Sequence, residues 1–130
     1  MSTDRTVVES ADAPDAVGPY SQAVGAAGLL FCSGQIPLDP ASGEISGETA
    51  AEQTTRCLRN LAAVCTAAGT TLDRALRLTV YTTDLGAFSA INEAYAEFFE
   101  SQPPARAAVQ VAALPKGAMV EIDAIVAAPD

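Results

Sequence analysis

The stretch TAAEQTTRCLRNLAAVCTAAGTTLDRALRLTVYTT, residues 49–83, decides the fold class because the period of its apolar residues changes within it. Thr49 and Glu52 have the spacing of a helix capping box. Apolar residues then recur mostly at steps of three and four, up to a glycine of the kind that ends helices. Beyond the glycine, apolar and polar residues alternate, as in a strand. The stretch therefore predicts a helix over residues 49–68 and a strand over residues 75–83.

The rest of the chain adds a second helix and more strands. Asp84 is placed to cap a helix whose apolar stripe consists of Phe88, Ile91, Tyr95, Phe98 and Phe99. Further strands are predicted at residues 5–9, 29–32, 106–113 and 119–127. This order is typical of an α+β domain, in which a mostly antiparallel or mixed β-sheet carries both helices on one face. We expect a single domain over residues 1–130.

A sheet with helices on one face leaves its other face uncovered. In the strand over residues 75–83, one face consists of Leu76, Leu78, Val80 and Thr82, and the other of Thr79, Tyr81 and Thr83. The uncovered strand residues are expected to be largely alanine, valine and leucine. We therefore expect oligomerisation to bury this face.

Composition excludes several classes of function. The 130 residues include 16 acids against 7 lysines and arginines, a net charge of −9, which disfavours broad nucleic-acid binding. Histidine is absent, so histidine-activated nucleophiles, imidazole metal sites and histidine acid–base catalysts are excluded. Proton transfer is left to carboxylates, tyrosines, cysteines, the single lysine or water.

The three cysteines, Cys32, Cys57 and Cys65, are an odd number without a CxxC pair, so neither a disulfide framework nor a thiolate zinc site is indicated. The longest apolar run, residues 23–32, is far shorter than the roughly 20 residues that span a bilayer. The polar, acidic N-terminus has no apolar core of a signal peptide. We expect a cytoplasmic protein with no membrane partner.

Arg106 is the first candidate for chemistry. It follows two prolines and an alanine at the start of a predicted strand, and alternation places it on one face with Ala108 and Gln110. Small neighbours leave room for a ligand in front of the guanidinium, which can bind a carboxylate through two hydrogen bonds. The alternative is a solvated arginine at a strand end.

Glu121 is the second candidate. In the strand over residues 119–127 it shares a face with Asp123, whereas Val120, Ile122 and Ala124 share the other. Such a carboxyl group is either part of a solvated face or a general acid–base beside a reacting carbon.

The remaining candidates are a helix residue and loop residues. Asn92 lies beside the apolar stripe of the second helix, where its amide binds either backbone or a ligand. Tyr20 follows Gly18-Pro19, and Ser33-Gly34 ends a buried strand. Loop residues held by a scaffold often line sites, although turn formation explains these glycines equally well.

Taken together and in this order, the motifs closely resemble the RidA family of reactive-intermediate enamine/imine deaminases, from about residue 6 to 127. The motifs are GPYSQA (18–23), SGQIP (33–37), TVYTTDL (79–85), the stripe around Asn92, PPARAAV (103–109), LPKGA (114–118) and VEIDAI (120–125). The most diagnostic are PPAR and VEIDAI.

The resemblance implies a chorismate-mutase-like fold, a homotrimer with ligand clefts between subunits, and hydrolysis of 2-imino acids such as 2-iminobutanoate and 2-iminopropanoate to 2-keto acids and ammonia. It implies no metal and no organic cofactor. By matching positions, Arg106 binds the substrate carboxylate and Glu121 activates water, while the pocket is lined by Tyr20, Ser33, Gly34 and Asn92. Many relatives carry a cysteine where this chain has Ala108, so only the backbone N–H of Ala108 is left to bind a ligand there.

Two other functions compete with the deaminase. One is a regulatory trimer that uses Arg106 to bind a carboxylate metabolite without catalysis. The other is a ribonuclease or translation inhibitor, a label that some family members carry. The net charge of −9 and the absence of histidine and of a basic stripe count against RNA as a partner.

Overall fold

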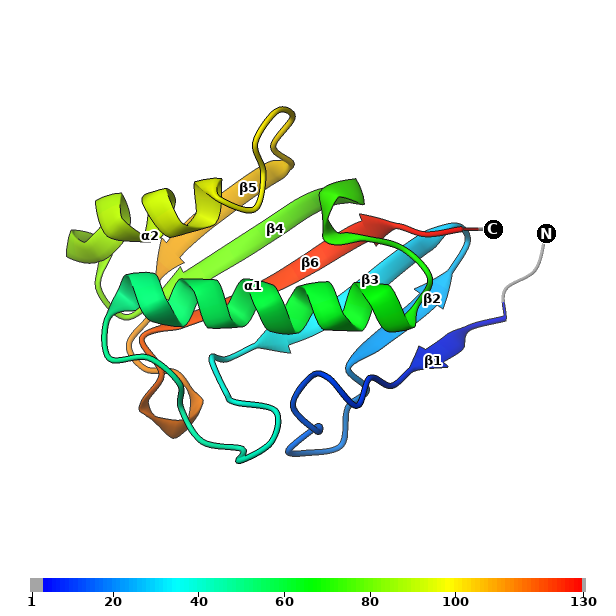
Figure 1. The fold of residues 1–130 in the computed structure, drawn as a ribbon, viewed down its shortest axis with the longest axis horizontal. Helices are drawn as coiled ribbons and strands as arrows, with labels where there is room; N and C mark the ends of the chain where they lie inside the picture. The colour runs from blue at the N-terminus through cyan, green and yellow to red at the C-terminus, as the bar shows by residue number, and fades with distance from the viewer. Residues whose placement is uncertain (1–3, 130) are drawn as a thin grey trace.

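A computed structural model describes residues 4–129 as one sheet with two helices on one face (Figure 1). The strands are β1 (Thr6–Val8), β2 (Ala23–Ala26), β3 (Leu29–Gln35), β4 (Ala75–Thr82), β5 (Ala105–Gln110) and β6 (Val120–Ala127). The helices are α1 (Ala50–Ala67) and α2 (Phe88–Ala96), with short 3₁₀ turns at Leu72–Arg74, Leu85–Ala87 and Pro115–Gly117. No helix of residues 4–129 has the length and apolar character to cross a membrane.

The sheet has the strand order β1-β2-β3-β6-β4-β5. Neighbouring strands are antiparallel except β4 and β5, which are parallel and are connected through α2. Such a parallel pair needs a crossover connection, which is why α2 packs on the sheet beside β5. The predicted mixed sheet of an α+β domain is confirmed.

Helix α1 begins and ends as its sequence predicts. The Thr49 side chain accepts from the Glu52 N–H at 3.1 Å, and Glu52 accepts from the Thr49 N–H at 3.2 Å, so the capping box is formed. Gly69 follows the helix with φ +79°, the left-handed conformation that glycine adopts at little cost.

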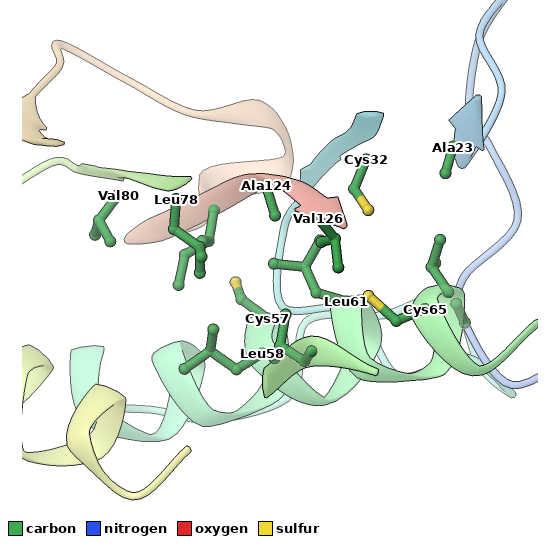
Figure 2. Packing of buried hydrophobic residues seen from close by; sticks show 14 of the residues in the cluster. Ala23, Cys32, Cys57, Leu58, Leu61, Cys65, Leu78, Val80, Ala124 and Val126 are labelled. Atoms are coloured by element: carbon green, nitrogen blue, oxygen red, sulfur yellow. The ribbon is translucent and has the colours of Figure 1, made fainter. Parts of the chain in front are cut away.

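The core lies between α1 and the helix-facing side of the sheet (Figure 2). In β6 every second residue from Val120 to Val126 is buried, as alternation predicts, while Glu121 and Asp123 are on the opposite face. The sulfur atoms of Cys57 and Cys65 lie in this core on α1, opposite β6 and β3 respectively. All three cysteines are free and buried, and burial raises the pKa of Cys57, so thiol chemistry is not available to a ligand at the surface.

Several local predictions are wrong. Leu76 does not join the buried face of β4 but is 50% exposed, because Ala75 pairs with Val126 and Arg77 with the adjacent Ile125, which leaves Leu76 as the extra residue of a bulge. Asp84 caps a 3₁₀ turn through the Gly86 N–H at 2.8 Å, and α2 starts only at Phe88. Strand β5 ends at Gln110 rather than at residue 113, and β2 was not predicted at all.

The face of the sheet away from the helices is more polar than predicted. It carries Phe31, which is 47% exposed, and Val109, which is 42% exposed, but also Tyr81, Glu121 and Asp123. The run over residues 29–32 is therefore only half buried within one chain, since Phe31 points away from the core that Leu30 and Cys32 enter.

Candidate functional site

Arg106 lies on the edge strand β5 and faces α2. Its parallel pairing partner is Leu78, a core residue of β4, so the Arg106 side chain leaves the sheet on the side of the helices. There Nη1 donates to Asn92 Oδ1 at 2.8 Å. The guanidinium carbon also lies 5.2 Å from the ring centroid of Phe88 and 4.8 Å from that of Tyr95. The guanidinium is thus held from one side by α2 while the residue stays exposed.

Three residues of α2 make these contacts because of helical spacing. Phe88, Asn92 and Tyr95 are at positions i, i+4 and i+7, which places them on one face of the helix. The apolar stripe seen in the sequence is therefore also the surface that the Arg106 side chain contacts. Sequence reasoning selected Asn92 but missed Phe88 and Tyr95, although their spacing from Asn92 is the signal that identifies them.

Ala108 supplies a backbone donor near Arg106. The Val111 N–H donates to the Thr82 carbonyl at 2.8 Å, which fixes the alternation of backbone groups along β5. Since β5 is at the end of the sheet order, the N–H of Ala108, three residues earlier, points to the open edge. Ala108 and Arg106 lie on the same face of β5. The Ala108 N–H and the Arg106 guanidinium are therefore two donors on the same side of this strand.

Glu121 leaves the sheet on the opposite face. Its partner on β4 is Tyr81, which lies on the face without helices. Burial raises the pKa of Glu121, and the negative charge of Asp123 raises it further. The Tyr81 hydroxyl donates to Asp123 Oδ2 at 3.1 Å. Glu121 is therefore a half-buried carboxyl group whose proton is held more tightly than that of an exposed glutamate. A raised pKa of this kind is suited to general acid–base chemistry.

Gly34 lies against Glu121, and Ser33 and Tyr20 are connected to Gly34 through the chain and one hydrogen bond. A Cβ on Gly34 would overlap Glu121 Oε2, so the absence of a side chain at Gly34 lets the carboxylate occupy its present position. Ser33 Oγ donates to the carbonyl of Ser21 at 2.6 Å, which joins the strand to the segment that carries Tyr20. The Tyr20 ring is 45% exposed, and its hydroxyl accepts from the Val17 N–H at 3.2 Å.

The predicted site residues thus form two separate groups. The arginine group consists of Arg106, Asn92 and Ala108 on the helix side of β5. The glutamate group consists of Glu121, Gly34, Ser33 and Tyr20 on and beside the other face. One chain does not bring the two groups together.

Comparisons with known proteins agree with this architecture. Residues 10–128 match the family described as Endoribonuclease L-PSP. The chain belongs to this family, which includes RidA. RidA from an Antarctic Psychrobacter has a solved structure that superposes with a TM-score of 0.90 at 40% identity, covering 94% of this chain and 98% of that one.

Curated RidA relatives have names of more than one kind. The RutC family protein y4sK of Sinorhizobium fredii is 53% identical over 119 residues, which are 92% of this chain and 94% of that protein. The human protein named 2-iminobutanoate/2-iminopropanoate deaminase is 44% identical over 121 residues, 93% of this chain and 88% of that protein. The family is therefore established, and one of its named activities is imine deamination.

If Glu121 has the acid–base role that the resemblance implies, Gly34→Ala is expected to lower turnover by about 10- to 100-fold, because misplacement of a reacting group by about 1 Å has this effect. The added Cβ would lie 2.9 Å from Glu121 Cδ, so the flexible carboxylate must move while the backbone stays. Turnover and the thermal unfolding midpoint should be measured together, and only turnover should change.

Gly25→Ala is the matched control, since its Cβ would meet no atom closer than 3.7 Å. Equal turnover of Gly34→Ala and the parent would show that the position of this carboxylate does not matter.

Proposed function

We propose that this RidA-family protein hydrolyses 2-imino acids, such as 2-iminobutanoate and 2-iminopropanoate, to 2-keto acids and ammonia. The observation that carries the proposal is the guanidinium of Arg106, held by Asn92 beside an open strand edge where the Ala108 N–H also points. This arrangement suits a planar carboxylate, which takes parallel hydrogen bonds from a guanidinium. The name of the human relative supports the same substrate class.

We propose that a complete site is formed by two subunits of a homotrimer. Within one chain the arginine and glutamate groups lie on opposite faces of the sheet. A neighbouring copy that packs on the exposed face around Phe31 can bring its arginine group to the glutamate group of the first. Rotational symmetry then repeats the site once per subunit.

The proposed reaction is the addition of water followed by the loss of ammonia. The protonated imine carbon, conjugated to a carboxylate, is already electrophilic, so no covalent nucleophile, metal or organic cofactor is required. Arg106 fixes the carboxylate. Glu121 takes a proton from water while the water oxygen bonds to C2, and a carbinolamine forms. Glu121 then delivers that proton to the amine nitrogen, the C–N bond breaks, and ammonia leaves as the carbonyl forms and the hydroxyl proton passes to solvent.

The decisive experiment couples this protein to a threonine dehydratase, which releases 2-iminobutanoate, and times the appearance of 2-oxobutanoate. We expect catalytic amounts of the protein to accelerate keto-acid release beyond spontaneous hydrolysis. Binding of 2-oxobutanoate without any acceleration would instead support the non-catalytic, carboxylate-binding trimer.

Asp123→Asn is expected to shift the acidic limb of the pH–rate profile to lower pH. Burial is the main cause of the raised Glu121 pKa, and the charge of Asp123 is the second cause. Removal of that charge lowers the Glu121 pKa, so the carboxylate needed as the base persists at lower pH. The asparagine oxygen can still accept from Tyr81.

The measurement is turnover from pH 4 to pH 8 for the parent and Asp123→Asn, with Asp73→Asn, an exposed site, as the matched control. A limb that stays in place, or moves to higher pH, would contradict the assignment of Glu121 as the base.

A further inference from the structure

The face of α2 that contacts Arg106 carries two aromatic rings in addition to Asn92. The guanidinium carbon lies over two rings at once, 5.2 Å from the centroid of Phe88 and 4.8 Å from that of Tyr95. Phe88 is half-buried and Tyr95 is buried, so these rings are themselves fixed by packing. Tyr95 also packs against Phe99, with ring centroids 4.9 Å apart and ring planes tilted by 42°.

We propose that Phe88 and Tyr95 are positioning residues for Arg106, and that their rings set the affinity of the site for the carboxylate of a 2-imino or 2-keto acid. This inference rests on the proposed function for the identity of the ligand. It concerns residues that do not touch the reacting atoms but act through the guanidinium.

The contacts of the guanidinium with α2 leave most of its N–H donors available to a ligand. An aromatic ring attracts a cation that lies over the face of the ring, and this attraction needs no hydrogen bond. The N–H donors lie in the guanidinium plane, and among the side chains of residues 4–129 only that of Asn92 engages one of them, Nη1. The rings therefore hold the group without consuming the donors that a carboxylate needs.

Holding the guanidinium in advance reduces the entropic cost of binding. A flexible arginine must lose rotamer freedom when it binds a ligand, and this loss weakens binding. Arg106 is exposed and starts an edge strand, so its neighbours in the sheet restrain it little. Restraint comes from α2, and loss of one ring is expected to weaken carboxylate binding by about three- to tenfold.

The chain offers matched variants for this test. The Tyr95 hydroxyl is buried without a hydrogen-bond partner among the described residues, so Tyr95→Phe removes an unsatisfied group and keeps the ring. Phe88→Leu removes a ring that is only half-buried, with little risk to folding. Phe98→Leu is the control. It makes the same Phe-to-Leu change as Phe88→Leu, but at a ring that packs against the core.

The experiment has two readouts on the intact protein. Calorimetric titration with 2-oxobutanoate gives the affinity, and the Nε–H resonance of Arg106, assigned with Arg106→Lys, reports the ring-current field on the guanidinium. We expect Phe88→Leu and Tyr95→Leu to bind three- to tenfold more weakly, with a shifted Nε–H signal. Tyr95→Phe, the conservative variant that keeps the ring, should restore the affinity lost in Tyr95→Leu, and the control Phe98→Leu should match the parent in both readouts.

Parent-like affinity and an unmoved resonance in Phe88→Leu would overturn the proposal, as would equal weakening by Phe98→Leu. A change in unfolding temperature alone, without either readout changing, indicates a purely structural role and also overturns it. If the parent itself does not bind 2-oxobutanoate, the proposed function fails, and the resonance still decides whether the rings position Arg106.

Discussion

Arg106→Ala is expected to abolish the acceleration of keto-acid release in the dehydratase-coupled assay. Each charge-assisted hydrogen bond to a carboxylate contributes about 1.5–3 kcal/mol, so loss of a two-bond contact lowers kcat/KM by about 10²-fold or more. The fold should survive, because Arg106 is exposed and, within the part of the chain that the structure describes, its side chain hydrogen-bonds only to Asn92. Light scattering and thermal unfolding check assembly and stability.

Two further variants sharpen this result. Arg106→Lys keeps the positive charge but loses the planar pair of donors, so it should still bind 2-oxobutanoate more weakly than the parent. Arg59→Ala removes an exposed arginine of α1 and should leave turnover unchanged. Imine hydrolysis by Arg106→Ala at the parental rate would show that the carboxylate is bound elsewhere.

Glu121→Gln should separate binding from catalysis. The amide keeps the size and most of the hydrogen bonding of the carboxyl group but cannot relay protons, so turnover should fall by roughly 10²-fold or more. Binding of 2-oxobutanoate should persist because the arginine group is untouched. Titration and the coupled assay measure the two effects separately.

Glu93→Gln, at an exposed position of α2, is the matched control and should behave as the parent. Unchanged turnover in Glu121→Gln would assign the proton relay to water or to Tyr20 instead.

Local sequence signals predicted the parts of the fold that local interactions determine. The capping box of Thr49 and Glu52 and the glycine after the helix bound α1 within a residue or two. Alternation assigned Glu121 to the face opposite Ile122 because the period of a strand allows no other arrangement. Strand β2 was missed because the segment AVGA has neither alternation nor several β-branched residues.

Long-range pairing explains what the sequence did not predict. No local signal places the last strand, β6, between β3 and β4, or produces the irregularity that exposes Leu76. Alternation grouped Arg106 with Ala108, but only the pairing of Arg106 with Leu78 shows that this group faces the helices. The separation of Arg106 from Glu121 therefore emerges only once the sheet is assembled, and so do the contacts of Arg106 with Phe88 and Tyr95.

Mixed subunits test most directly the claim that imine hydrolysis takes place at a site shared between two copies of this chain. Arg106→Ala and Glu121→Gln proteins, each nearly inactive, are unfolded together, refolded as a mixture and assayed with the dehydratase. If neighbouring subunits supply the two groups, random assembly restores about a quarter of the sites, with turnover near a quarter of the parental value. Each variant refolded alone should stay inactive. Mixed assemblies, verified by mass, that remain as inactive as the separate variants would contradict the shared site.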